Sequence, residues 1–334
     1  MGRAWYPATE TFIREGGAAE LSKSSKKRPV ETIAGPFFSV IVASYQRPTC
    51  HLDLTLRALA RQDLPKEEFE VIVVDDGSEL PPQDLIDSSR ESLNLTFLKQ
   101  PRSGPAAARN NGASQAKGKF LAFTDDDCAP SENWLSSLAK TFADSPTHMV
   151  GGRNLNAVTN NIFSTATQIH LDFLFEHYNR DLTKPKFFVS HNLAVPHQLF
   201  DTIGGFDQGF FLGGEDRDIC YRWLKRGYGM SYDPNAVVYH YHGLSLSSFL
   251  IQHYNYGCGA FRFRYKIAQI DAKQIKFENL RFYLQCILYP CSARVGKDRL
   301  IFSTLLALSQ IANAWGVLKS SKSSKTQLVS PAIW

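Results

Sequence analysis

The stretch Lys119–Pro130, "KFLAFTDDDCAP", joins an apolar run to three consecutive carboxylates, Asp125, Asp126 and Asp127. The apolar run predicts a buried strand, and in open α/β sheets ligands bind beyond the carboxyl ends of the strands. Three adjacent like charges repel one another, so a divalent cation shared with a ligand's phosphates would stabilise them. The alternative is a solvated acidic turn that caps the next helix, because the helix dipole favours carboxylates at its N-terminus.

The composition indicates a globular protein. The chain has 334 residues, 43% of them hydrophobic, which is enough for one large α/β domain or two modest ones. A net charge of +5 suits a phosphate-bearing ligand or an anionic membrane surface, and it is too small to indicate nucleic acid. We read no secretory signal and no C-x-x-C pair, and so expect reduced thiols in a cytoplasmic protein without structural zinc. The cysteines are Cys50, Cys128, Cys220, Cys258, Cys286 and Cys291.

The chain divides into segments of different pattern. Residues 1–36 predict a solvated tail. In residues 37–150, apolar runs such as "FFSVIVAS" and "FEVIVVDD" alternate with helical patterns such as "HLDLTLRALARQ", which predicts a parallel sheet covered on both faces. Residues 151–260 are irregular and rich in Gly, His and aromatic residues. Residues 261–334 begin with the basic and aromatic "FRFRYK" and predict a helical extension.

The extension contains an uncharged segment, Leu300–Leu318, followed by "KSSKSSK". It is long enough to cross a bilayer. On a helix, however, its polar residues fall within about a third of the circumference, except Thr304. A spanning helix, an amphipathic helix lying in a membrane surface and a helix packed on the domain therefore stay open, with peripheral attachment to the inner membrane face as one expectation. The residues of the polar stripe are Ser303, Ser309, Gln310 and Asn313.

Other motifs join the three carboxylates. "FEVIVVDDGSE" ends in Asp75 and Asp76, and "SGPAAARNNGA" carries Arg109 just before the acidic strand. With "SVIVASY", the D-x-D element and "GGEDRDICYR", these motifs resemble the family 2 glycosyltransferases with the GT-A fold, from Phe37 to Gly259. The resemblance implies a mostly parallel central sheet with helices on both faces, divided into a nucleotide-sugar half (37–150) and an acceptor half (151–260). It also identifies the opening carboxylates as the D-x-D element, which holds a divalent cation on the donor's diphosphate.

The resemblance assigns donor-binding roles to four residues of the first half. Tyr45 matches the position near the donor's base, and Asp76 matches the acid that hydrogen-bonds the base. Asp75 is the neighbour of that acid. Arg109 matches a basic residue close to the phosphates, where a planar guanidinium suits an anion.

The resemblance also implies a Mg²⁺ or Mn²⁺ site. Asp125 matches the ribose-side member of D-x-D and Asp127 the metal ligand, although three acids in a row also allow a register in which Asp126 is the ligand. His240 and His242, in "AVVYHYHG", project to one face if the run is extended. In the family, a histidine here completes the metal shell or contacts the diphosphate; a structural role is the alternative.

The acceptor side carries the predicted base. Asn192 matches an active-site asparagine, and Glu215 and Asp216 precede a helix. The resemblance makes Asp216 the general base that deprotonates the acceptor hydroxyl in a single, inverting displacement. A helix cap is the alternative for this pair. Processive members carry Q-x-x-R-W, and here Ile219 stands at the Gln position, which indicates transfer of a single sugar.

We therefore predict an inverting glycosyltransferase of cell-envelope, polysaccharide or glycoconjugate biosynthesis. Its donor would be a nucleotide sugar, with a UDP-sugar favoured, and its acceptor a glycan, a lipid-linked glycan or another hydroxyl compound. A sugar nucleotidyltransferase would carry a glycine-rich phosphate loop after the first strand, and "ASYQRPTCHLD" has no glycine. A non-catalytic glycan- or nucleotide-binding protein would have lost the acids, all of which are present.

Overall fold

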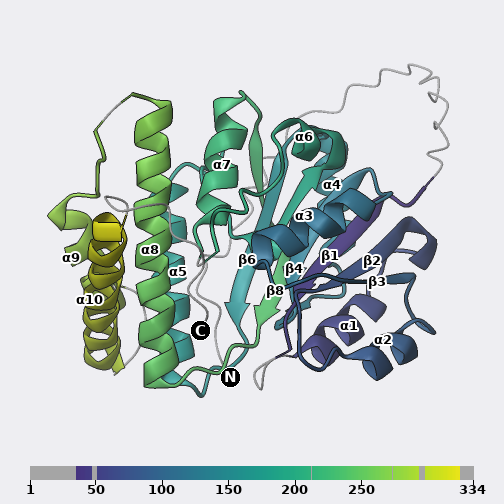
Figure 1. Cartoon of the computed structure of the whole chain (residues 1–334), viewed down its shortest axis with the longest axis horizontal. Helices are drawn as coiled ribbons and strands as arrows, with labels where there is room; N and C mark the ends of the chain where they lie inside the picture. The colour runs from purple at the N-terminus through teal and green to yellow at the C-terminus, as the bar shows by residue number, and fades with distance from the viewer. Residues whose placement is uncertain (1–34, 47–50, 212, 273, 293–297, 324–334) are drawn as a thin grey trace, which may run out of the picture.

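The computed structural model describes residues 35–46, 51–211, 213–272, 274–292 and 298–323. Most of the predicted N-terminal tail and Cys50 lie outside these ranges. The centre is one sheet with the strand order β3-β2-β1-β4-β7-β6-β8-β5 (Figure 1). Its strands are β1 (Phe38–Ser44), β2 (Phe69–Asp75), β3 (Leu95–Lys99), β4 (Phe120–Asp125), β5 (Cys128–Pro130), β6 (Met149–Asn156), β7 (Leu193–Pro196) and β8 (Met230–His240).

The first half of the sheet is parallel. β1 pairs with β2 and β4, and β2 pairs with β3, all in parallel register. β7 is antiparallel to both β4 and β6, while β6 and β8 are parallel. Because Ser44, Asp75 and Asp125 end three adjacent parallel strands, their side chains meet at one edge of the sheet.

The β1 sequence explains why helices cover both faces. Alternate residues point to opposite sides of a strand. Val40 and Val42 belong to a core that includes α1, α2 and α4, whereas Ile41 packs in a second core with α3, α6 and α7. The predicted sheet with helices on both faces is confirmed. The helices are α1 (Leu52–Ala60), α2 (Gln83–Ser89), α3 (Pro105–Gln115), α4 (Trp134–Asp144), α6 (His197–Thr202) and α7 (Glu215–Lys225).

A further helical layer lies beside the sheet, on the left of Figure 1. α5 (Ile162–Tyr178), α8 (Leu246–Ile270) and α10 (Arg299–Ser323) share one apolar cluster, and α5 and α9 (Leu280–Ser292) share another. α8 continues across residue 260, the predicted boundary between residues 151–260 and the C-terminal extension. An unbroken helix therefore joins these two segments.

The polar stripe of α10 faces inward. Ser309 is fully buried, and Gln310 and Asn313 line a cavity between this helical layer and the carboxyl ends of the central strands. The opposite face presents exposed apolar side chains, among them Ile311 and Trp315. In the part of the chain that the structure describes, one helix, Arg299–Lys322, is long and apolar enough to cross a membrane, with 28% of its apolar window buried.

Candidate active site

The carboxyl ends of β1, β2 and β4 open into a cavity of about 450 Å³. The start of α7, the end of β8 and the layer formed by α5, α8, α9 and α10 complete its walls. The predicted site residues that line it are Tyr45, Asp76, Arg109, Asp125, Asp126, Asp127, Glu215, Asp216, His240 and His242. Ten side chains from six separate segments of the chain therefore line one space.

Three hydrogen-bond donors hold the carboxylate of Asp76, which directly follows β2 in the cavity wall. Its carboxylate accepts hydrogen bonds from Gln100 Nε2 and from the backbone N–H groups of Ser103 and Gly104, each at 2.8 Å. Gly104 has a φ of 89°, a conformation that glycine adopts without strain, and it begins α3. Beside this wall, the guanidinium of Arg102 lies 4.3 Å from the centre of the Tyr45 ring. A planar base stacked on such a surface would find a carboxylate at its edge.

Arg109 joins the end of β4 to the start of α7 across the cavity. Its Nη2 donates to Asp125 Oδ1 at 2.6 Å and its Nη1 donates to Glu215 Oε1 at 3.0 Å. The arginine side chain is only 3% exposed. Burial alone would lower its pKa, but the charges of Asp125 and Glu215 raise the pKa above its ordinary value. Arg109 is therefore a fixed cation.

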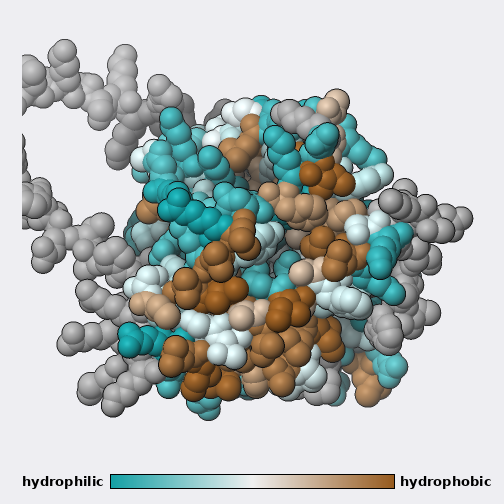
Figure 2. Space-filling model, turned by 90° about the vertical axis from the view of Figure 1, so that its left-hand side faces the viewer, coloured by the Kyte–Doolittle hydropathy of each residue, from teal (hydrophilic) through white to brown (hydrophobic). Residues whose placement is uncertain are grey.

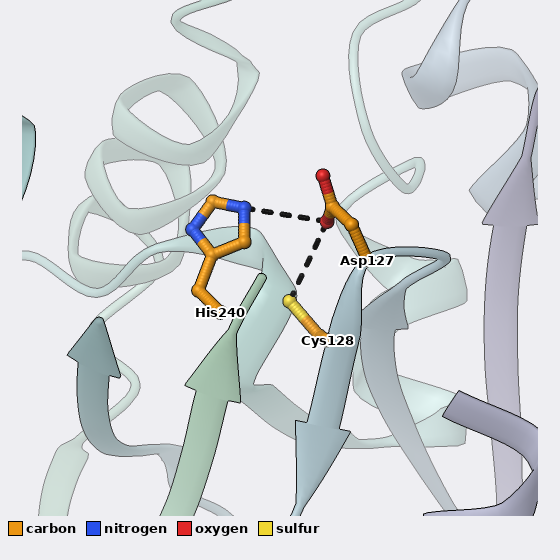
Figure 3. A group of neighbouring side chains, drawn as sticks. All are labelled: Asp127, Cys128 and His240. Atoms are coloured by element: carbon orange, nitrogen blue, oxygen red, sulfur yellow. Dashed lines mark hydrogen bonds and ion pairs between the residues drawn. The ribbon is translucent and has the colours of Figure 1, made fainter. Parts of the chain in front are cut away.

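Asp127, Cys128 and His240 form a group that could hold a metal ion (Figure 3). Asp127 Oδ1 lies 3.3 Å from His240 Nε2, and Cys128 Sγ lies 3.8 Å from the same oxygen. The antiparallel pairing of Cys128 with His240, which ends β8, brings the three residues together. A carboxylate and an imidazole that converge from two strands fit a divalent cation.

The three consecutive acids have different partners. Asp126 Oδ2 accepts from the backbone N–H of Tyr45 at 3.0 Å, and Asp125 binds Arg109. Asp127 faces His240. This geometry favours Asp127 over Asp126 as the metal ligand of the D-x-D element.

Two further histidines lie beside His240. The rings of His240 and His242 stack with centroids 3.9 Å apart, as expected for side chains on one face of an extended run. Burial, followed by the charge of His240, lowers the pKa of His242 to about 3 and that of His191 to about 4. Both rings are therefore neutral at physiological pH.

Asp216 lies at the start of α7. Gly214, two residues before Asp216, is the N-cap of this helix, and its φ of 99° again suits glycine. Asp216 Oδ1 accepts from the backbone N–H of Arg217 at 2.7 Å. Burial, and then the charge of Glu215, raises the pKa of Asp216 to about 7. Because Glu215 is paired with Arg109, Asp216 is the carboxylate better suited to accept a proton at neutral pH.

Two predicted substrate-binding residues lie outside the cavity lining. Asn192 is 1% exposed; its Nδ2 donates to Arg153 and Ala236 carbonyl oxygens at 3.0 Å, and its Oδ1 accepts from Trp134 Nε1 at 2.9 Å. Its amide thus joins α4, β6 and β8, and this geometry gives no support to the predicted contact with substrate. Asp75 is 2% exposed and accepts from both the backbone N–H and the hydroxyl of Ser78, so it shapes the turn after β2.

Sequence reasoning missed much of the acceptor side. Cys128 is the third member of the candidate metal group, yet the sequence analysis predicted only a reduced thiol there. The helical layer contributes polar and aromatic residues, and the sequence signals among them were the basic, aromatic "FRFRYK" run, which supplies Arg264, and the polar stripe with Gln310 and Asn313. The layer's other lining residues include Gln168, Tyr178, Gln252, Tyr256 and Tyr283.

The sheet and the acid-rich cavity at its strand ends fit a glycosyltransferase, and the comparisons agree. Residues 39–204 match Glycosyl transferase family 2. The chain is 27% identical over 212 residues to glycosyltransferase AglE of Haloferax volcanii, covering 61% of this chain and 67% of that protein. It is 32% identical over 197 residues to the pre-mycofactocin glycosyltransferase of Mycobacterium tuberculosis, covering 58% of this chain and 42% of that protein. The chain belongs to glycosyltransferase family 2 and is a glycosyltransferase.

A solved structure supports the fold. The mannosyltransferase PcManGT from Pyrobaculum calidifontis, in complex with GDP-Man and Mn²⁺, superposes with a TM-score of 0.59 over 85% of this chain and 87% of that one. The two sequences are 18% identical, so the likeness establishes the GT-A fold. The match to the M. tuberculosis relative spans less than half of that protein's length.

Proposed function

We propose that the chain transfers a single sugar, with inversion, from a nucleotide-diphosphate sugar to a hydroxyl acceptor. One observation carries the proposal: the candidate metal pair, Asp127 and His240, and the half-buried carboxylate of Asp216 line the same cavity. A cation held by Asp127 and His240 would suit a diphosphate, and the carboxylate of Asp216 would suit a hydroxyl that must lose its proton.

The donor would bind at the parallel strand ends. Asp76, fixed by three hydrogen bonds, would accept from the base, and the Tyr45 ring beside Arg102 would pack on it. Asp125, held by Arg109, would contact the ribose. UDP-sugars are our first candidates, although these contacts suit any base that presents a donor group at its edge.

Asp127 and His240 would hold the divalent cation, Mg²⁺ or Mn²⁺. When bound, the ion would stabilise the negative charge that develops on the departing diphosphate. Mn²⁺ accepts carboxylate and imidazole ligands together, and a neutral His242 stacked on His240 would help fix the orientation of the ligating ring.

The transfer step would depend on Asp216. Its carboxylate would accept the proton of the acceptor hydroxyl while the hydroxyl oxygen bonds to the anomeric carbon, and the bond from that carbon to the diphosphate oxygen breaks with its electron pair on the diphosphate. Glu215 would act as a positioning residue, because its Oε1 is bound to Arg109. Ile219 is buried in the core below α7, which supports release after one transfer.

α10 supports attachment to a membrane surface. Its exposed apolar residues Ile301, Leu308, Ile311, Trp315 and Leu318 fall within about 100° of the helix circumference. Figure 2 shows hydrophobic side chains gathered on the face that this layer presents. The opposite, polar face lines the cavity, so a helix lying in the surface of the membrane fits better than a freely spanning one. An enzyme on the inner membrane face would act on cell-envelope or other lipid-linked glycans.

A donor-hydrolysis screen tests the activity. The purified chain is incubated with UDP-, GDP- and dTDP-sugars and Mg²⁺ or Mn²⁺, and release of the nucleoside diphosphate is measured. We expect slow, metal-dependent hydrolysis of one donor class, abolished by excess EDTA. Undiminished hydrolysis in EDTA would contradict the metal assignment, and the absence of hydrolysis or binding across the panel would contradict the donor assignment.

A further inference from the structure

The central cavity continues past Asp216 into the helical layer. A second cavity of about 370 Å³ lies against it, and the two share four lining residues: Tyr178, Phe187, Arg217 and Arg264. These four residues, here called the arginine gate, therefore form the boundary between the two cavities. Arg217 directly follows Asp216, so the boundary lies next to the proposed base.

Both arginines of the gate are laid against aromatic rings. The Arg217 guanidinium carbon is 4.4 Å from the Tyr178 ring centroid, and the Arg264 guanidinium carbon is 5.2 Å from that of Phe277. Stacking fixes a guanidinium in position and leaves its edge free to donate hydrogen bonds. The rings of Phe277, Phe282 and Tyr283 extend the aromatic lining of the central cavity.

The gate carries more positive charge than its neighbours compensate. Arg264 Nη2 lies 3.7 Å from Glu278 Oε1, which also accepts from the Tyr178 hydroxyl at 3.1 Å. Among the described residues, no carboxylate lies within ion-pair distance of Arg217. Burial, followed by the charge of Arg217, lowers the pKa of Arg264, as expected for two cations in one partly buried place.

The second cavity has the same excess of cations. Four cationic side chains and one carboxylate line it, so the net charge of the lining would attract an anion into this space. The cations are Lys186, Arg217, Arg264 and Lys276, and the carboxylate is Glu278.

We propose that the arginine gate binds an anionic group of the acceptor, a phosphate or a carboxylate, close to the hydroxyl that is glycosylated. The proposal rests on the proposed function, since it takes Asp216 to mark the position of the attacked hydroxyl. Arg217 and Arg264 would each donate paired N–H hydrogen bonds to the anion, and the aromatic rings would pack on the sugar that carries it. The gate would thus select charged acceptors over neutral ones.

Binding measurements on the full chain test the gate. The protein is saturated with Mn²⁺ and UDP, and it is titrated with octyl glucoside, octyl glucuronide and octyl glucoside 6-phosphate. Charge-assisted hydrogen bonds lead us to expect roughly tenfold to hundredfold tighter binding of the two charged ligands. Arg217→Gln, Arg264→Gln and the double variant should remove this preference and leave the affinity for octyl glucoside unchanged.

The controls separate the gate from folding and from the proposed function. Arg226→Gln removes an exposed arginine at the end of the same helix and should keep the preference. Arg217→Lys keeps the charge without the fork and should restore part of it. Donor hydrolysis needs no acceptor, so its absence would count against the proposed function while leaving the binding result to be judged on its own.

The source of the anion is settled by one more ligand. A polyprenyl phosphate in detergent that binds tighter than the sugar ligands, and loses affinity in the double variant, would place the anion on a lipid carrier. Preference for the sugar ligands would place it on the glycan. Equal binding of charged and neutral ligands to the unmodified protein, or a preference that survives in the double variant, would overturn the gate.

Discussion

Replacing Asp216 with Asn is the sharpest test of the mechanism. The substitution keeps the shape of the side chain and its ability to accept the hydrogen bond from the Arg217 N–H, but it removes the basic charge. Positioned proton transfer contributes roughly 10² to 10⁴-fold to a rate, so sugar transfer should fall by that factor. Donor binding should hardly change, because Asp76, Asp127 and His240 lie on other walls of the cavity.

The pKa of Asp216 gives the expected pH dependence. A base with a pKa of about 7 is about one-tenth ionised at pH 6 and about nine-tenths ionised at pH 8, so kcat/KM should rise about tenfold between them. The Asn variant should lose this rise. Stability should change in the opposite sense: the folded state binds the proton more tightly than the unfolded state does, so ionised Asp216 destabilises the fold progressively from about pH 4 to pH 7.

Rates and melting temperatures measured on the same preparations distinguish a base from a helix cap. For a base, Asp216→Asn should be slow in transfer, and its melting temperature relative to the unmodified protein should improve from pH 4 to pH 8. For a cap, it should lose about 1 kcal/mol of stability and keep its turnover. Asp201→Asn, which removes a carboxylate that is 68% exposed, is the matched control and should alter neither quantity. Near-normal transfer by the Asp216 variant would exclude Asp216 as the base.

Three further tests address the metal, the core and the membrane. Asp127→Asn and His240→Ala should each abolish the rise in melting temperature that Mn²⁺ produces in the unmodified protein; an unchanged rise would exclude the pair as ligands. Asn192→Ala should lower the free energy of unfolding by about 1–3 kcal/mol for each buried group left unpaired, with donor affinity intact, and a selective loss of donor affinity would return Asn192 to the site. Trp315→Glu should weaken sedimentation with anionic vesicles, and high salt should do the same, whereas Leu80→Glu, at an even more exposed leucine outside α10, should not. Equal sedimentation of both variants would contradict attachment through α10.

The donor side of the site is predictable because its signals are local. Each of Asp75, Asp76 and Asp125 stands at the end of an apolar run or directly after it, and parallel strands bring such ends together. The fold class follows from the same short-range patterns, whereas the strand order is known only from the structure.

The acceptor side is not predictable in this way, because its partners are distant in sequence. Asn192 matches an active-site position by motif. Its amide, however, accepts a hydrogen bond from Trp134, 58 residues away, and donates one to the carbonyl of Ala236, 44 residues away. The polar stripe of α10 was visible in the sequence, yet a polar stripe ordinarily faces solvent. Here Gln310 and Asn313 face a cavity, and only the packing of α10 in the helical layer shows it.

Arg109 explains why two neighbouring carboxylates at the start of α7 have different roles. The guanidinium is buried and binds Asp125 on one side and Glu215 on the other, so it fixes the Glu215 carboxylate in place beside Asp216. The ionised form of Asp216 is then disfavoured by burial and by the charge of Glu215 beside it, which raises its pKa to about 7. The same guanidinium ties the end of β4 to the start of α7 and so fixes the distance between the donor side and the base. One cation thereby sets both the geometry across the cavity and the basicity of the group that acts in it.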